Sequence, residues 1–104
     1  MYSFTKKKYL ESSLTLRRLL PKAPQNLQYT STTDSVTVTW DAVEGATKYN
    51  VYRGAAKTFD KSVTEPTYTA TGLTADTQLT INVTAVNSGG ESPMSEIVTR
   101  TKAQ

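Results

Sequence analysis

The sequence contains no cysteine and no histidine among its 104 residues. Without cysteine there is no disulfide framework, although small extracellular proteins can also lack disulfides, so the compartment stays open. Without histidine the chain lacks the usual general base, most zinc sites and every Ser-His or Cys-His nucleophile pair. The carboxylates Asp41, Glu44 and Asp60 fall in separate predicted loops, and no phosphate-cradling glycine loop is present. We therefore expect no enzyme activity, no cofactor and no metal site.

Long apolar runs are missing as well, and none could span a bilayer. Near the N-terminus, Glu11, Arg17 and Arg18 interrupt the leucines. A secretory signal needs an unbroken apolar core of about 7–15 residues. The sequence thus predicts neither a membrane span nor an export signal, and we expect a protein that stays cytosolic until it is assembled or released with something else.

The net charge of +3 is unevenly distributed. Residues 1–22 carry six basic side chains and one acidic side chain, whereas residues 23–104 carry six basic and eight acidic ones. Pro21 and Pro24 each push the preceding residue out of the helical region. We therefore divide the chain into a basic N-terminal arm, residues 1–22, and one domain, residues 23–104.

The arm combines basic residues with aromatic residues and leucines. Leu10 and Leu14 are one helical turn apart, yet Leu14, Leu16 and Leu20 also suit a strand, so a helix and an extended arm both remain open. A solvated leader, a nucleic-acid contact and a membrane-surface contact are alternatives to a docking arm that becomes ordered on a partner protein. We favour the docking arm, because its apolar side chains would be wasted on a free tail. The predicted contact residues are Tyr2, Phe4, Lys6, Lys7, Lys8, Tyr9, Leu10, Leu14, Leu16, Arg17, Arg18 and Leu19.

Residues 35–40 show the clearest strand pattern, with Val36, Val38 and Trp40 on one face and serine and threonines on the other. Trp40 is the only tryptophan, and burying it would make the largest single apolar contribution. The expected core residues are Val36, Val38, Trp40, Tyr49, Val51, Leu79, Ile81 and Val83.

Short strands separated by turn residues continue to the end of the chain. Strands are expected at about residues 25–30, 35–40, 49–53, 68–70, 79–85 and 95–101, with residues 54–60 forming a polar loop or a short edge strand that reaches residue 63. Residues 87–90 predict a hairpin turn. Seven strands with frequent turns and no intervening helix predict an antiparallel β-sandwich.

The ordered set of motifs strongly resembles a fibronectin type III domain over about residues 23–102. The residues that carry this resemblance are Pro24, Leu27, Val36, Val38, Trp40, Asp41, Gly45, Tyr49, Val51, Tyr52, Arg53, Leu73, Thr74, Val83, Val86, Asn87, Gly90, Ser92, Pro93, Val98 and Thr99. The resemblance implies an all-β, immunoglobulin-like sandwich of seven antiparallel strands. Such domains usually carry a tyrosine whose hydroxyl forms the tyrosine corner. Leu79 stands there, which keeps the apolar contact and implies a loss of about 1 kcal/mol for the missing hydrogen bond.

The resemblance leaves several functions open, because the family serves in adhesion proteins, bacterial extracellular glycosidases and phage virions. A small cysteine-free chain with threonine-rich strands and no export signal is most similar to the phage members. We therefore expect a non-enzymatic virion accessory protein, in capsid decoration or the tail, whose arm contacts other virion or assembly proteins and whose domain contacts cell-surface glycans. The alternative is a spacer or carbohydrate-adhesion domain of an extracellular bacterial protein; a nucleic-acid-binding protein is a third class.

Two further groups are candidate surface contacts. Asn87, Ser88 and Glu91 belong to the predicted loop between the last two strands, where related sandwiches often recognise partners. Turn geometry alone also explains this loop. A second group comprises tyrosines expected to be partly exposed, although tyrosines at such positions usually just cover a sheet face. This second group is Tyr29, Tyr52 and Tyr68.

Overall fold

The computed structural model describes residues 20–104 of the chain. These residues form eight β-strands and no helix, and every strand pair is antiparallel. The strands are β1 (Gln28–Ser31), β2 (Val36–Thr39), β3 (Lys48–Arg53), β4 (Thr58–Val63), β5 (Thr67–Ala70), β6 (Gln78–Asn87), β7 (Gly90–Glu91) and β8 (Ser95–Arg100). The predicted all-β class is confirmed.

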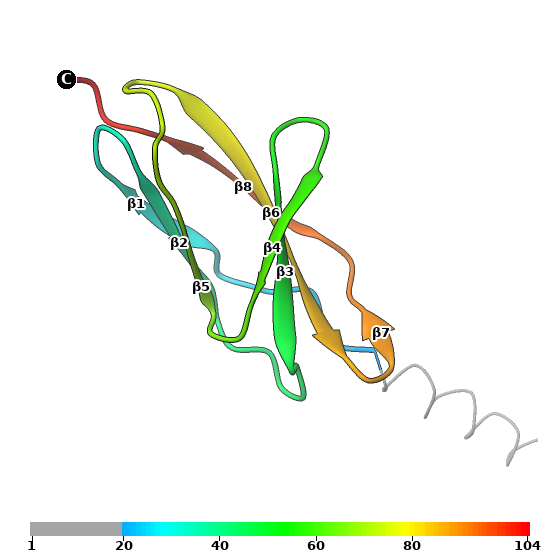
Figure 1. The fold of residues 1–104 in the computed structure, drawn as a ribbon. Coiled ribbons are helices and arrows are strands. Elements are labelled where there is room, and N and C mark those ends of the chain that lie inside the picture. Colours follow the sequence, from blue (N-terminus) through cyan, green and yellow to red (C-terminus); the bar gives the residue numbers. More distant parts are fainter. Residues whose placement is uncertain (1–19) are drawn as a thin grey trace, which may run out of the picture.

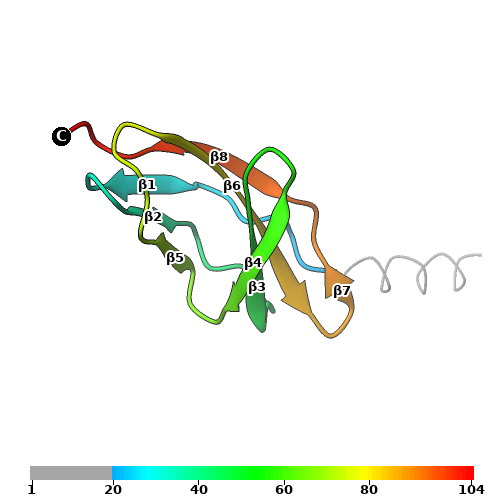
Figure 2. The ribbon, with the colours of Figure 1, turned by 45° about the horizontal axis from the view of Figure 1, so that its top comes forward.

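The strands form two sheets that face each other (Figure 1). One sheet has the order β1-β2-β5, and the other has the order β4-β3-β6, with β7 and β8 both pairing with β6. Residues 92–94 separate β7 from β8, and Pro93 in this segment has no N–H to give to the ladder. The seventh predicted strand, at about residues 95–101, is present as β8, and β7 is an additional short strand at the end of the predicted hairpin turn. In Figures 1 and 2 the described chain begins beside β7 and ends at the opposite end of the sandwich.

The core fills the space between the sheets and centres on Trp40. Its ring meets the ring of Tyr49 edge to face, with centroids 5.3 Å apart and planes at 72°. The Tyr49 hydroxyl accepts a hydrogen bond from the Val43 N–H at 2.9 Å, which satisfies the polar end of this buried side chain. Seven of the eight expected core residues are buried, and Leu79 is half-buried and packs against them.

Two strand boundaries differ from the expectation. β1 begins at Gln28 rather than near residue 25, because Asn26 has a φ of +57° that an extended strand cannot contain. The Asn26 amide instead donates to the Asp41 carboxylate at 2.6 Å. Residues 58–63, left open between a loop and an edge strand, form the six-residue edge strand β4, and a shift of register between Val51 and Tyr52 marks a bulge in its pairing.

Thr101 forms hydrogen bonds to the turn in which related domains usually have the tyrosine corner. The buried Thr101 hydroxyl donates to the carbonyl of Thr74 at 2.6 Å and accepts from the N–H of Thr77 at 2.9 Å. Both backbone groups belong to the turn that precedes β6, immediately before Leu79. The Thr101 hydroxyl, which follows the end of β8, thus supplies two hydrogen bonds to this turn. These bonds offset the loss of the tyrosine hydrogen bond that is expected at Leu79.

Candidate interaction surface

The predicted hairpin turn connects β6 to β7. Asn87 ends β6, and its side-chain oxygen accepts from the N–H of Gly89 at 2.7 Å. Gly90 has a φ of +140°, a backbone conformation that residues with a β-carbon rarely adopt, so glycine is favoured at this position. Asn87 and Ser88 lie at the turn, whereas Glu91 lies on β7 and points along the sheet surface.

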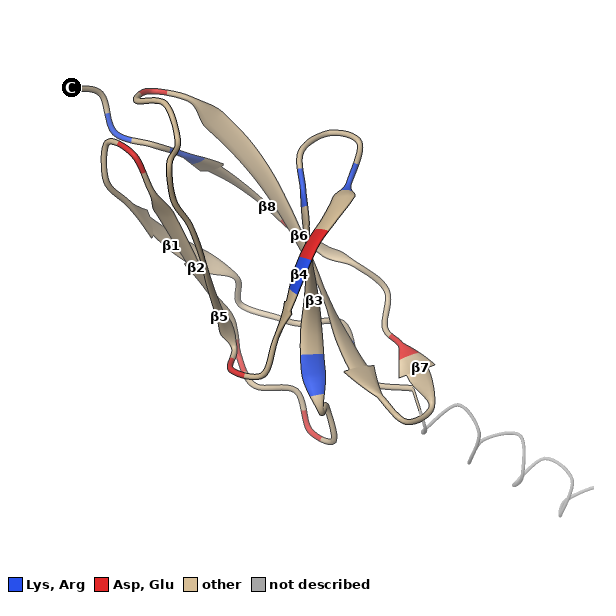
Figure 3. Cartoon of the chain, in the orientation of Figure 1, with Lys and Arg blue, Asp and Glu red and all other residues tan. Residues whose placement is uncertain are grey.

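Glu91 is the centre of a hydrogen-bond network on the outer face of the larger sheet. Its Oε2 accepts from the Thr84 hydroxyl at 2.5 Å, from the Asn50 amide at 3.3 Å and from the Tyr52 hydroxyl. Asn50 in turn accepts from the Ser62 hydroxyl at 2.6 Å. β7 consists of Gly90 and Glu91, and its acidic part is red in Figure 3. The network joins side chains from β4, β3, β6 and β7.

These contacts keep the Glu91 carboxyl ionised. Hydrogen bonds from the Thr84 and Tyr52 hydroxyls lower the pKa of this carboxyl below its ordinary value, and Asn50 and the charge of Lys48 act in the same direction. Burial and the neighbouring carboxylate raise the pKa of the Tyr52 phenol. The site is therefore a fixed negative charge with a neutral phenol beside it.

The three candidate tyrosines differ in exposure. Tyr29 on β1 is 39% exposed and Tyr52 is half-buried, which agrees with the expectation. The expectation for Tyr68 is wrong, since only 3% of it is exposed. Its ring packs in the core, and its hydroxyl donates to Asp60 at 2.6 Å.

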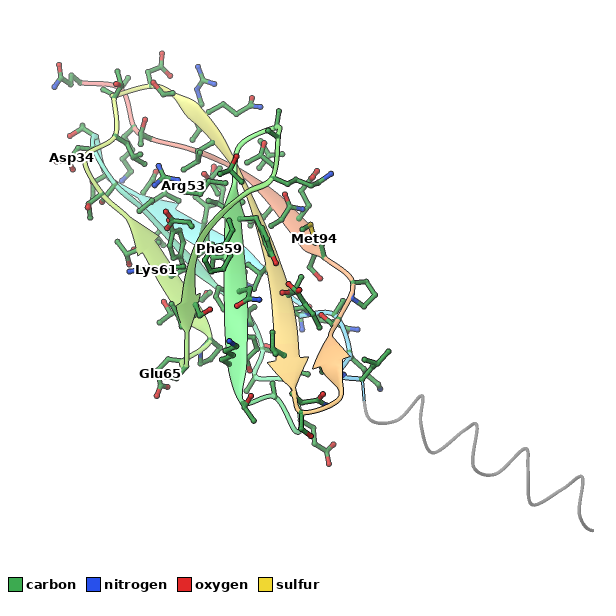
Figure 4. All side chains as sticks on the ribbon, turned by 45° about the vertical axis from the view of Figure 1, so that its right-hand side comes forward. Asp34, Arg53, Phe59, Lys61, Glu65 and Met94 are labelled. Atoms are coloured by element: carbon green, nitrogen blue, oxygen red, sulfur yellow. The ribbon has the colours of Figure 1, made fainter. Side chains whose placement is uncertain are left out.

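Tyr68 is part of a clasp between the edges of the two sheets. Its partner Asp60 lies on β4, and the Arg53 guanidinium lies 3.9 Å from the same carboxylate. The Lys61 ammonium lies 5.8 Å from the Tyr68 ring centroid. Figure 4 labels Arg53 and Lys61. Burial, followed by the hydrogen bond to Asp60, raises the pKa of Tyr68 to about 12.

Sequence reasoning missed Phe59. This side chain is 53% exposed, and its ring meets the Tyr52 ring edge to face, with centroids 5.7 Å apart. Phe59 sits in the segment left open between a polar loop and an edge strand, so no alternation indicated its face. The strand register indicates its face, because Phe59 pairs with Tyr52 on β3. An exposed aromatic ring thus adjoins the Glu91 network.

A second surface feature is an open depression of about 870 Å³ at the end of the sandwich where the described chain begins. Its walls include Leu20, Lys22, Asp41, Glu44 and Asn87. The depression therefore brings one predicted loop residue, Asn87, beside the end of the arm. The predicted arm contacts from Tyr2 to Leu19 lie outside the described residues.

Among residues 20–104, no group of three His, Cys, Asp or Glu side chains is placed to hold a metal ion. In the same part of the chain, no helix is long and apolar enough to cross a membrane.

Several proteins of known sequence are similar to this chain. The tail tube protein gp17.1* of Bacillus phage SPP1 is 71% identical over 82 residues, which is 79% of this chain and 31% of that protein. A poly(3-hydroxybutyrate) depolymerase of Ralstonia pickettii is 43% identical over 76% of this chain and 16% of its own length. Chitinase A1 of Niallia circulans is 43% identical over 67% of this chain and 10% of its own length. The chain thus spans less than a third of each of these relatives.

Solved structures show the same fold. The crystal structure of FN3tt aligns with a TM-score of 0.74 at 22% identity, over 81% of this chain and 97% of that one. A Fn3-like protein from Clostridium thermocellum aligns with a TM-score of 0.68 at 30% identity, over 75% and 90% of the two chains. A profile of the fibronectin type III domain matches residues 22–101. This chain belongs to the fibronectin type III family.

Proposed function

We propose that this chain is a non-enzymatic structural and interaction module of a phage virion, placed on the tail. The observation that carries the proposal is the 71% identity to a tail tube protein, which extends over 79% of this chain. The other two relatives are 43% identical, so the phage protein is much more similar in sequence. The sequence-based expectation named capsid decoration and the tail alike, and the similarity to a tail tube protein favours the tail.

The proposal assigns attachment to the basic N-terminal arm. The described chain begins beside β7, and residues 20–22 line the open depression at that end. Attachment there would leave both sheets and the far end of the sandwich free. The arm contacts named from the sequence, from Tyr2 to Leu19, would then bind another virion protein, with the basic residues facing an acidic surface.

Immunogold electron microscopy tests the location. An antibody raised against residues 23–104 would be applied to purified virions of the phage that encodes the chain. We expect gold along the tail and not on the capsid. Gold on the capsid alone would move the protein to capsid decoration, and virions without any gold would overturn the virion assignment.

The alternative function is a spacer or carbohydrate-adhesion domain of an extracellular bacterial protein. It is supported by the 43% identity to domains in a depolymerase and a chitinase. The same antibody separates the two functions, because a secreted spacer would be found in the culture medium of uninfected bacteria and would be absent from virions.

A further inference from the structure

The outer face of the larger sheet carries a row of aromatic and polar side chains that is exposed at Phe59, Ser62 and Glu91 and buried at Thr84. Tyr49 and Val51 of β3 are buried, so the alternate residues Asn50 and Tyr52 point outward. Ser62 and Phe59 on β4 pair with these two residues on one side, and Thr84 on β6 pairs with Asn50 on the other. We call the row Asn50, Tyr52, Phe59, Ser62, Thr84 and Glu91 the Glu91 face.

The carboxylate in this face has one oxygen held by the protein and one that is not. All three donors, from Thr84, Asn50 and Tyr52, bind Oε2. Within residues 20–104, Oε1 receives no hydrogen bond, and Glu91 is exposed. Three donors on one oxygen fix the orientation of the group, so Oε1 is a pre-oriented acceptor for a donor outside the protein.

Phe59 places a flat apolar surface at the other end of the row. Its ring is 53% exposed, and its edge-to-face contact with Tyr52 holds it next to the network. Tyr52 links the two ends, since its ring contacts Phe59 and its hydroxyl contacts Glu91. The face therefore presents an apolar ring, Phe59, and a fixed anionic acceptor, Glu91, with the Tyr52 side chain between them.

We propose that the Glu91 face binds neutral glycans. A hexopyranose has an apolar C–H face that can cover the Phe59 ring and a rim of hydroxyl groups that can donate to Glu91 Oε1. An acidic sugar or a phosphate would meet this carboxylate, whose hydrogen-bond donors are all uncharged and on which the charge of Lys48 has a smaller effect than the hydrogen bonds from Thr84 and Tyr52 do. The inference rests on the proposed function, since a module on the outer surface of a virion meets the glycans of the host surface.

The test is an NMR titration of the full chain with neutral trisaccharides of glucose, galactose, mannose or N-acetylglucosamine, each added to about 10 mM. We expect at least one of these trisaccharides to shift the amide signals of the Glu91 face. Its dissociation constant should be about 1 mM, which is typical of a small open site. No shift with any of the four, or shifts confined to the depression around Asn87, would overturn the proposal.

Matched variants separate the face from general surface effects. Phe59→Ala and Glu91→Gln should each weaken binding of the same trisaccharide about tenfold, because each removes one of the two recognition elements. Tyr29→Ala, an exposed aromatic on the other sheet, and Glu44→Gln, a loop carboxylate, should leave it unchanged. The spectra of all four variants report whether the sandwich is intact.

Competing ligands are further outcomes of the same titration. Tighter binding of a sulfated trisaccharide, or of an unrelated acidic peptide, than of the neutral sugars would contradict the proposal. Because the titration uses no virions, it is independent of the immunogold result. A protein absent from virions that still binds glycans would overturn the location alone.

Discussion

At the scale of single residues, Glu91 shows how one side chain can join three strands. Its neighbours in the network are at positions 50, 52 and 84, so the contacts exist only after β3, β6 and β7 pair. Each donor favours the ionised carboxylate. The free energy of unfolding of the domain should therefore fall at acid pH.

The first prediction concerns that dependence. The carboxyl of a glutamate in an unfolded chain has a pKa of about 4.3. The pKa of Glu91 is lower in the folded state, so its contribution is present above that value and is lost as pH falls through the folded pKa. Urea unfolding at pH 7 and at pH 3 should show the loss, and Glu91→Gln should reduce the difference between the two pH values. An unchanged difference would contradict the network's role.

Tyr68 should have the opposite effect at alkaline pH. Its pKa is raised to about 12, above the ordinary 10.0, so its contribution is complete below pH 10 and is lost as pH rises through the folded value. The measurement is urea unfolding between pH 9 and pH 12. In Tyr68→Phe the alkaline loss should be smaller than in the natural chain, whereas Tyr29→Phe, at an exposed position, should retain the full loss.

Residue faces were predictable where alternation was regular. The alternation of residues 35–40 and 79–85 correctly indicated the buried valines, Trp40 and Ile81. Tyr68 was expected to be partly exposed and is buried, and Phe59 was not assigned at all, because the environment of both depends on β4, a strand whose sequence is mostly polar. The Glu91 network was also beyond prediction, since strand register, which sequence alone did not reveal, decides which polar side chains meet.

At the scale of elements, the turn before β6 shows how a missing family feature is compensated. Leu79 cannot form the tyrosine-corner hydrogen bond, but Thr101 reaches the same turn from the end of β8. Its hydroxyl satisfies one backbone carbonyl and one N–H at a buried position. Nothing in the local sequence indicated this contact, because Thr101 lies 27 residues from Thr74.

The corner yields a third prediction. Thr101→Val keeps the shape of the side chain but leaves the Thr74 carbonyl and the Thr77 N–H without this partner. We expect the free energy of unfolding to fall by about 1–3 kcal/mol. Thr39→Val, at an exposed position of β2, should change it by less than about 0.5 kcal/mol. Equal effects of the two substitutions in chemical denaturation would show that the Thr101 hydroxyl is not important.

The strands themselves were largely predictable, and their ends were not. Alternation and turn residues correctly indicated the sandwich and the hairpin at residues 87–90. The start of β1 was wrong because a left-handed Asn26 precedes it, and Asn adopts that conformation without any signal in the apolar pattern. The last strand was predicted at about residues 95–101 and is present as β8. The short strand β7 was not predicted, and residues 92–94, with Met94 labelled in Figure 4, separate it from β8.

At the scale of the whole molecule, the two ends of the described chain lie at opposite ends of the sandwich (Figure 1). An attachment through the arm would therefore place β7 near the particle and residue 104 away from it. The Glu91 face runs across β4, β3, β6 and β7 on the outside of the larger sheet. It would remain accessible in such an arrangement.

The fourth prediction is that the sandwich folds without the arm. Of the described residues that are removed, Leu20 is 48% exposed, Lys22 is exposed and Pro21 is buried, so the domain loses one small packed side chain. A version that starts at Ala23 should keep the dispersed NMR spectrum of the full chain and lose no more than about 1 kcal/mol of unfolding free energy. A collapsed spectrum would make the arm part of the fold.

The most direct test of the account compares these two versions in co-sedimentation with purified virions that lack the protein. The account predicts that the full chain still sediments with the virions at high salt and that the version starting at Ala23 stays in the supernatant. Salt screens the contacts of the basic residues, but the apolar side chains of the arm keep it attached. If neither version sediments, or if both do equally, the claim that the arm attaches this module to a phage particle is contradicted.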